Sequence, residues 1–249
     1  MPVVASPVKI ATSRHAGFVR VTHWLTFIAF VALLITGGEI VISHPRFYWG
    51  ETGNVNMRPL FTIPIPSSRD TVPTGYPYVM PDQNGWSRYL HFQAAWLLVF
   101  TGAVYLIAGL ATGHFRRNLL PARGERTIGA HWRRIAQYLR RAPPYEFEAR
   151  SYNVLQRTTY LVVIFILFPL VIWTGLALSP GFNAAFPFFV NVLGGRQSAR
   201  TLHFFVSGAL LLFLVVHIVM IAVSGFWVRT KPMIIGRTAS APASFEEEP

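Results

Sequence analysis

The composition of this 249-residue chain is unusual, because 52% of its residues are hydrophobic and only 13% are charged, whereas a soluble domain usually carries about 25% charged residues. The chain has no cysteine, which excludes iron–sulfur clusters, thiolate haem ligation, covalent haem attachment and disulfides. A net charge of +12 would suit a nucleic-acid binder, but the arginines lie between and beside apolar runs, so we favour membrane topology as their explanation and expect no nucleic-acid partner.

Four apolar runs follow one another along the chain, at residues 21–42, 89–112, 158–178 and 201–226. Each is long enough to cross a hydrocarbon layer of about 30 Å, which takes roughly 20 helical residues. The first run is too long for the apolar region of a signal peptide and no small-residue cleavage site follows it, so we expect it to be retained. The sequence therefore predicts an all-α membrane protein, a bundle of four transmembrane helices. Residues 1–237 are expected to form one domain, followed by a disordered tail at 238–249.

The loops differ in charge, and this difference predicts the orientation of the bundle. The inner loop at 113–151 is rich in arginine, and further basic residues precede the first run and follow the fourth. Basic residues gather in cytoplasmic segments of inner-membrane proteins. We therefore expect a multi-pass protein of the bacterial inner membrane with both termini in the cytoplasm.

Two loops are predicted to be structured. Between residues 126 and 141, apolar residues recur at helical spacing opposite arginines, which predicts an amphipathic helix on the inner membrane surface. An ordinary solvated helix is the alternative. The outer loop at 43–87 combines many prolines with aromatic residues, and its aromatic content argues against disorder. We expect it to fold as a cap that docks a partner protein.

Four histidines lie inside the apolar runs, where ligating residues are rare and usually functional. His203 and His217 are separated by fourteen residues, so they share a helix face about 21 Å apart along the axis. Matching depths across the bundle pairs His91 with His203 near the outer face, and His23 with His217 near the inner face. Each pair could clamp the iron of a haem, since bundle cores commonly hold such cofactors. Hydrogen bonding between helices, zinc or copper binding, and a competing Met220 ligand are the alternatives.

An arginine precedes three of these histidines by three residues, and these arginines are Arg20, Arg88 and Arg200. Residues three apart share a helix face, and each arginine would lie nearer water than its histidine. The spacing therefore predicts charge-assisted hydrogen bonds from these arginines to haem propionates. Snorkelling to the lipid headgroups is the alternative. Glycines such as Gly37 and Gly175 either leave room for macrocycles or serve close helix packing, and Pro169 is expected to kink the third helix.

The Arg-x-x-His-Trp run at Arg20 to Trp24 and the His203–His217 spacing resemble a known family. This is the family of prokaryotic cytochrome b subunits of formate dehydrogenases, nickel–iron hydrogenases and thiosulfate-reductase-type molybdoenzymes. The resemblance implies two b haems held by His23, His91, His203 and His217, with electrons passing between an extracytoplasmic enzyme and the quinone pool. Residues 44–51 of the outer loop look more like the subunits that pair with molybdopterin enzymes than like hydrogenase subunits.

The leading hypothesis is thus a membrane-anchor electron-transfer subunit that links a periplasmic oxidoreductase, of molybdopterin type or a hydrogenase, to quinone. We expect the quinone near His23, His217 and Arg20, where His15 and His114 could move protons. A stand-alone haem oxidoreductase, acting on superoxide or metals, is the first alternative, and it would purify without a partner. A transporter with a histidine relay is the second, and it would be colourless.

Overall fold

The computed structural model describes residues 15–54, 56–64, 86–121, 124, 126–140, 154–223 and 225–236. Within these residues, four helical segments are long and apolar enough to cross a membrane: α1 (Gly17–Ser43), α2 (Trp86–Ala111), the segment Val154–Leu178, and α8 (Arg196–Val223). The predicted four-helix membrane fold is confirmed. Each helix begins a few residues before its predicted apolar run, because hydropathy marks only the part of a helix that lies in hydrocarbon.

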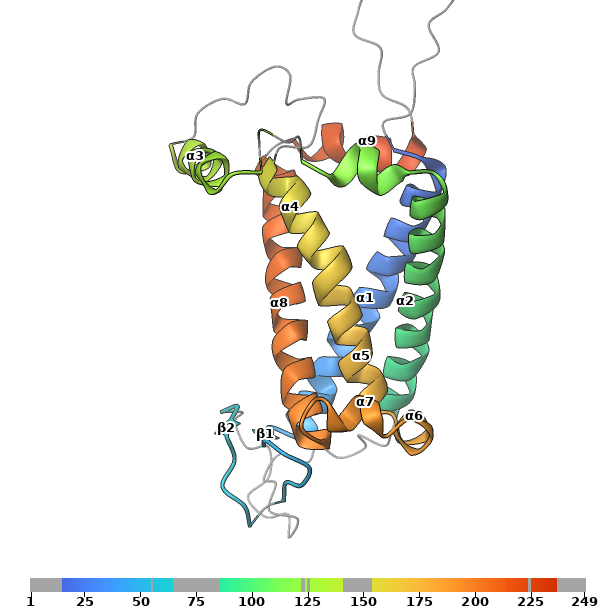
Figure 1. The fold of residues 1–249 in the computed structure, drawn as a ribbon, viewed down its shortest axis with the longest axis vertical. Helices are drawn as coiled ribbons and strands as arrows, with labels where there is room; N and C mark the ends of the chain where they lie inside the picture. The colour runs from blue at the N-terminus through green and yellow to red at the C-terminus, as the bar shows by residue number, and fades with distance from the viewer. Residues whose placement is uncertain are drawn as a thin grey trace, which may run out of the picture.

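The four spans form two pairs (Figure 1). Helix α1 packs closely along α2, and α5, the second half of the third span, packs closely along α8, whereas the two pairs contact each other much less. A small core joins them, formed by Val163, Val171, Val206 and Leu210 with Phe30 of α1 packed against it. Side chains of α1 and α2 therefore meet those of the third span and α8 at the interface between the two helix pairs.

The third span is not a continuous α-helix. It consists of α4 (Val154–Val162), a π-helical turn η4 (Val163–Leu167) and α5 (Phe168–Leu178). Pro169 has no N–H to donate to the carbonyl of Phe165, and the wider π turn ends just before this proline. The break predicted from Pro169 therefore takes the form of a π turn, a feature frequent at functional sites.

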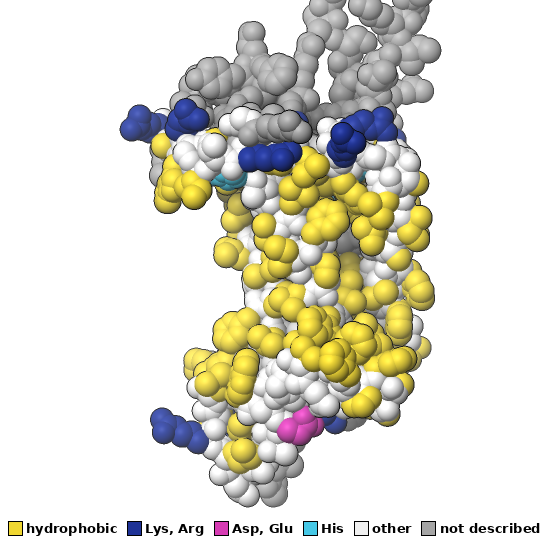
Figure 2. Space-filling model, in the orientation of Figure 1, with side chains coloured by type: hydrophobic (Ala, Val, Ile, Leu, Met, Phe, Trp, Pro, Cys, Tyr) yellow, Lys and Arg dark blue, Asp and Glu magenta, His cyan; other side chains and the backbone are white. Residues whose placement is uncertain are grey.

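The two ends of the bundle carry different elements (Figure 1). We call one the basic end; it carries η1 (Phe115–Leu119), α3 (Ile128–Leu139) and α9 (Phe226–Ile235), and Lys and Arg side chains gather on it (Figure 2). Helix α3 corresponds to the predicted amphipathic helix, and its Ile128 and Trp132 are 77% and 65% exposed. Helix α9 was not predicted, because Pro232 and basic residues interrupt its sequence.

The opposite end, which we call the hairpin end, carries a two-stranded antiparallel hairpin of β1 (Arg46–Phe47) and β2 (Phe61–Thr62). The short helices α6 (Pro180–Ala185) and α7 (Phe188–Asn191) lie at the same end (Figure 1). The described part of the predicted cap is thus folded. Residues 65–85 of the loop and the tail at 238–249 lie outside the described residues.

The segment that contains β1 is fastened to the start of α8. Thr201 Oγ1 donates to the carbonyl of Tyr48 at 2.7 Å, and Ser198 Oγ accepts from the backbone N–H of Gly50 at 2.8 Å. Gly195, with φ +108°, allows the backbone of the hairpin segment to lie close to the start of α8, because a Cβ there would lie 2.7 Å from the backbone of Glu51. These contacts hold the hairpin over the end of α8 and hence near His203.

The sides of the bundle are apolar. Side chains such as Ile28, Leu212 and Val223 are 59%, 65% and 79% exposed, and hydrophobic side chains cover the middle of the face in Figure 2. Large exposed apolar surfaces mark sites of interaction with membranes or proteins. The combination of this surface with four apolar spans indicates that lipid covers the sides.

Candidate functional site

The four histidines of the apolar runs meet in two pairs, in the combination that helix depth predicts. At the hairpin end, the rings of His91 on α2 and His203 on α8 have centroids 6.3 Å apart and planes inclined by 68°. At the basic end, the rings of His23 on α1 and His217 on α8 have centroids 6.4 Å apart and planes inclined by 49°. We call them the hairpin-end pair and the basic-end pair. Each pair spans the interface between the two helix pairs.

The spacing of both pairs fits two imidazoles that bind one metal ion from opposite sides. A metal–histidine nitrogen bond is about 2.0 Å long, and with the nitrogen roughly 1.1 Å from the ring centre, two such rings have centroids about 6.2 Å apart. The observed 6.3 and 6.4 Å agree with this value. Direct hydrogen bonding between the imidazoles would bring the rings closer.

The rest of the coordination cannot come from clustered side chains. In the described part of the chain, no three His, Cys, Asp or Glu side chains gather where they could hold a metal ion. A metal held by only two opposed protein ligands needs a planar ligand that supplies the remaining positions, which is what a porphyrin does. The donor set, two neutral imidazoles at each place, therefore fits haem iron better than zinc, whose sites usually take three or four protein ligands at one point.

The hairpin-end pair is held by two threonines that the sequence analysis missed. Thr36 Oγ1 of α1 lies 2.9 Å from His91 Nδ1, and Thr174 Oγ1 of α5 lies 2.9 Å from His203 Nδ1. Both threonines are fully buried. The only sequence signal was a Thr-Gly dipeptide in each helix, which indicates nothing until the partner histidine is known.

A glycine follows each of these threonines and lies against the same imidazole. A Cβ at Gly37 would lie 3.5 Å from His91 Cε1, and a Cβ at Gly175 would lie 3.3 Å from His203 Cε1. Of the two roles that the sequence allows for these glycines, room for a macrocycle or close helix packing, the observed contacts correspond to close packing between helices. The glycines allow the imidazole of a neighbouring helix to approach the backbone closely.

The basic-end pair has aromatic neighbours instead. The ring of Phe213 stacks on His217 at 5.6 Å with an angle of 28°, and Tyr160 meets His217 edge-on at 6.4 Å. Trp24 meets His23 edge-on at 5.4 Å. Among the described residues, we observe no hydrogen bond to either imidazole of this pair.

The three arginines predicted to meet haem propionates have different surroundings. Arg20 donates to the carbonyl of Ile234 in α9 at 2.8 Å, while its Nε is buried without a hydrogen-bond partner in the described chain. Arg200 donates to the carbonyls of His44 and Arg46, so it fastens the hairpin to α8. Arg88 lies exposed at the start of α2. Their contact with propionates stays a prediction.

The remaining histidines lie outside the spans. His114 at the basic end accepts from Asn118 Nδ2 at 2.9 Å and packs against the rings of Phe18 and Tyr105. Burial, and then the Arg117 cation, lower the pKa of His114 below its ordinary value. His131 joins α3 to α4 through Thr158 Oγ1 at 2.9 Å.

Four apolar spans and two opposed histidine pairs are the arrangement expected of a membrane cytochrome of the b type. Comparison with known proteins agrees: the chain belongs to the prokaryotic cytochrome b561 family, whose family model matches residues 14–236. The family resemblance noted from the sequence is therefore confirmed, and the protein is a cytochrome b561-type membrane haem protein.

One curated relative is similar over most of its length. The chain is 26% identical over 219 residues to a protein of Azospira oryzae named "Putative protein-methionine-sulfoxide reductase subunit YedZ1", and the match covers 84% of this chain and 89% of the relative. No solved structure matches the chain at a significant level.

Proposed function

We propose that this protein is a membrane-anchor subunit that carries electrons through two b haems between the quinone pool and a periplasmic oxidoreductase. The observation that carries the proposal is the presence of two histidine pairs of nearly equal spacing at different depths of one bundle. Fourteen residues of α8 separate His203 from His217, which is about 21 Å along the helix axis. Two cofactors at these depths would form a route across most of a hydrocarbon layer about 30 Å thick.

Haem bound at these pairs would supply one-electron redox chemistry, while the protein sets its position and surroundings. His91 and His203 would hold one iron, and His23 and His217 the other. Since α8 contributes a ligand to both pairs, one helix fixes the distance between the two sites.

The basic end is where we propose that quinone reacts. Arg20 and Trp24 both donate to carbonyls of α9, at Ile234 and Met233, so the start of α1 and α9 meet close to His23. The buried, unpartnered Nε of Arg20 is a donor for a carbonyl oxygen of a quinone or for a haem propionate. His114, whose pKa is lowered by burial, is a neutral proton acceptor at the same end.

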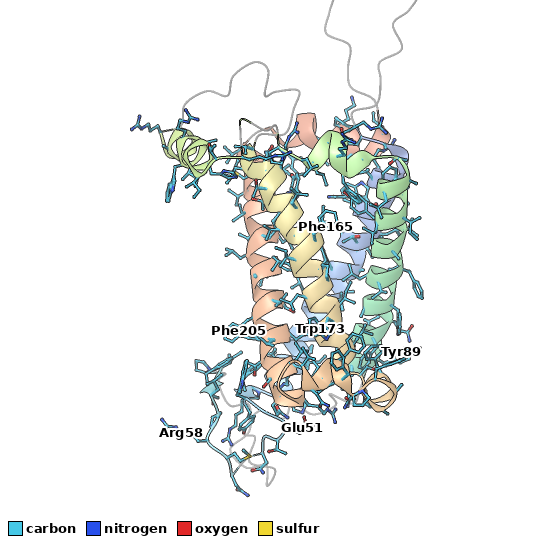
Figure 3. The ribbon with its side chains drawn as sticks, in the orientation of Figure 1. Glu51, Arg58, Tyr89, Phe165, Trp173 and Phe205 are labelled. Carbon is cyan, nitrogen blue, oxygen red and sulfur yellow. The ribbon has the colours of Figure 1, made fainter. Side chains whose placement is uncertain are left out.

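The hairpin end is where we propose that the partner enzyme docks. Trp49 and Leu60 of the folded hairpin region are 58% and 60% exposed, and exposed apolar side chains on an ordered element favour a protein interface. Arg58 projects away from the bundle at this end, whereas Glu51 lies close under the end of the bundle (Figure 3), where its carboxylate accepts from the backbone N–H of Arg196 at 3.0 Å. The name of the Azospira relative describes it as a reductase subunit, and the outer-loop resemblance favours a molybdopterin partner.

The charge distribution supports an orientation for this route. Most basic residues lie in segments that lead to the basic end, and such segments usually stay in the cytoplasm. We therefore propose that both termini are cytoplasmic, that the basic end faces the cytoplasm, and that the hairpin end faces the periplasm of an inner membrane.

The decisive experiment is haem quantification in purified wild-type protein and in His91→Ala and His217→Ala variants. We expect two b haems per chain by pyridine haemochrome, and the loss of one haem in each variant. His131→Ala is the matched control, since His131 lies outside both pairs and this variant should keep both haems. A folded but colourless wild type would overturn the proposal in favour of a histidine relay.

Co-purification separates the subunit from a stand-alone oxidoreductase. If a soluble periplasmic enzyme accompanies the protein from native membranes and accepts electrons from reduced quinone only in its presence, the subunit role is supported. Quinol oxidation or superoxide reduction by the isolated chain at full rate would support the stand-alone alternative.

A further inference from the structure

We propose that Thr36 and Thr174 are positioning residues of the hairpin-end pair, each accepting the Nδ1 proton of one imidazole so that both Nε2 atoms are presented as ligands. The inference rests on the proposed function, because it assigns the roles of residues around one of the two haems. Neither threonine would itself touch the iron.

The direction of each hydrogen bond follows from the single proton of the threonine hydroxyl. Thr36 Oγ1 donates to the carbonyl of Ala32 at 2.7 Å, and Thr174 Oγ1 donates to the carbonyl of Leu170 at 2.8 Å. A hydroxyl carries one hydrogen and two acceptor lone pairs. With its hydrogen directed at the helix carbonyl, each hydroxyl accepts from the histidine. Nδ1 of each ring therefore carries the proton, and Nε2 is free to bind a metal.

Burial supports this assignment. Both threonines are fully buried, and an unpaired polar atom in such a place would be destabilising. The proposed arrangement satisfies the hydroxyl, the helix carbonyl and Nδ1 together. The opposite tautomer would place a proton on Nε2 and leave that atom unable to bind a metal.

The two anchors are arranged alike although they come from different helices. In each, the threonine of a Thr-Gly dipeptide places its hydroxyl at Nδ1 of the histidine. The glycine that follows has no side chain, so Cε1 of the same ring can lie close to the backbone. One dipeptide lies on α1 and serves a ligand of α2, and the other lies on α5 and serves a ligand of α8. Each helix pair thus supplies the anchor for its own imidazole.

Such hydrogen bonds change the haem as well as its position. A donor bond from the second ring nitrogen raises the basicity of a ligating imidazole and fixes the ring orientation. A more basic ligand favours ferric over ferrous iron, so these bonds should lower the midpoint potential of the hairpin-end haem. They should also fix the angle between the imidazole planes, which is 68° here.

Thr36→Val and Thr174→Val, alone and together, test the inference, because valine keeps the shape of threonine and removes its hydroxyl. We expect both haems to stay bound and the potential of the hairpin-end haem to rise. A tenfold change in the relative stability of the two iron states would appear as about 59 mV for one electron. The largest g value of its low-spin EPR signal, which depends on the angle between the imidazole planes, should shift as well.

Matched variants separate this role from simple packing. Thr22→Val removes a buried hydroxyl of α1 that donates to Phe18 in the same way but lies outside the hairpin-end pair, and it should leave the hairpin-end haem unchanged. Thr36→Ser and Thr174→Ser retain the hydroxyl and should keep the wild-type potential and EPR signal. If the valine variants lose the haem altogether, retention of haem in the serine variants would still support the hydroxyl role.

The outcomes distinguish this inference from the proposed function. Signals are assigned with His91→Ala and His217→Ala, and if these variants keep both haems, the proposed function and this inference both fail. If each loses one haem but the valine variants leave the potential and EPR signal of the hairpin-end haem unchanged, only the role of the threonines is overturned. Loss of haem from serine and valine variants alike would also overturn it.

Discussion

The hairpin-end and basic-end pairs have almost the same ring spacing, 6.3 and 6.4 Å, but very different neighbours. At the hairpin end, buried hydroxyls and glycine backbone hold both imidazoles. At the basic end, aromatic rings pack around them, and His23 is more exposed than the other three. The comparison teaches that helix geometry sets the spacing of the imidazoles, while the neighbouring helices decide how each imidazole is held.

The largest effect should come from filling the space beside a hairpin-end ligand. Gly175→Val would direct side-chain carbons at His203 Cε1, which lies only 3.3 Å from the position of a Cβ. We expect the imidazole to be displaced and, with two haems as proposed, one of them to be lost, measured as haem per chain. Gly38→Val is the control, because nothing lies within 4 Å of a Cβ there. Retention of both haems with wild-type spectra in Gly175→Val would contradict the close packing of His203.

A smaller effect should follow from a change at the basic-end pair. Phe213→Leu removes the ring that stacks on His217, and an aromatic contact of this kind is worth about 0.5–1.5 kcal/mol. We expect up to about tenfold weaker retention of the basic-end haem on dilution, with the hairpin-end haem unchanged. Leu212→Ala, at an exposed neighbouring position, should alter neither. An equal effect on both haems would show that the two sites are not independent.

The smallest effect concerns the pH dependence of the hairpin. Burial, followed by the Arg200 and Arg88 cations, lowers the pKa of His44 below its ordinary value despite a hydrogen bond with Ile40 that raises it. The folded hairpin therefore favours neutral His44, so its stability should be complete above about pH 6.5 and decline as pH falls below that ordinary value.

Limited proteolysis of residues 44–64 between pH 7.5 and 5.5 measures this decline. Cleavage should accelerate modestly at the lower pH, and His44→Gln should remove most of the dependence. Faster cleavage at the higher pH would contradict the assigned direction. The haem proposed for the basic end should not respond, since His23 and His217 lie at the opposite end of the bundle from the hairpin.

Sequence reasoning succeeded where the signal was local and failed where it depended on partners. Helix α3 was predicted from the spacing of residues such as Ile128 and Trp132. Helix α9 was not, because Pro232 interrupts its sequence and the donors that hold it, Arg20 and Trp24, lie on α1. Arg200 was interpreted only through its spacing from His203. Its hydrogen bonds to the carbonyls of His44 and Arg46 join residues far apart in the chain, so they cannot be predicted from the spacing of residues within one helix.

The sequence by itself determined the four spans and the combination of histidines in each pair. Both follow from local geometry, because hydropathy defines a span and a fixed rise per residue places each histidine at a depth. Only the tertiary structure decided that Thr36 and Thr174 anchor one pair and that aromatic rings surround the other. Those contacts join residues up to 57 positions apart in the chain, and the packing of the helices determines which residues become neighbours.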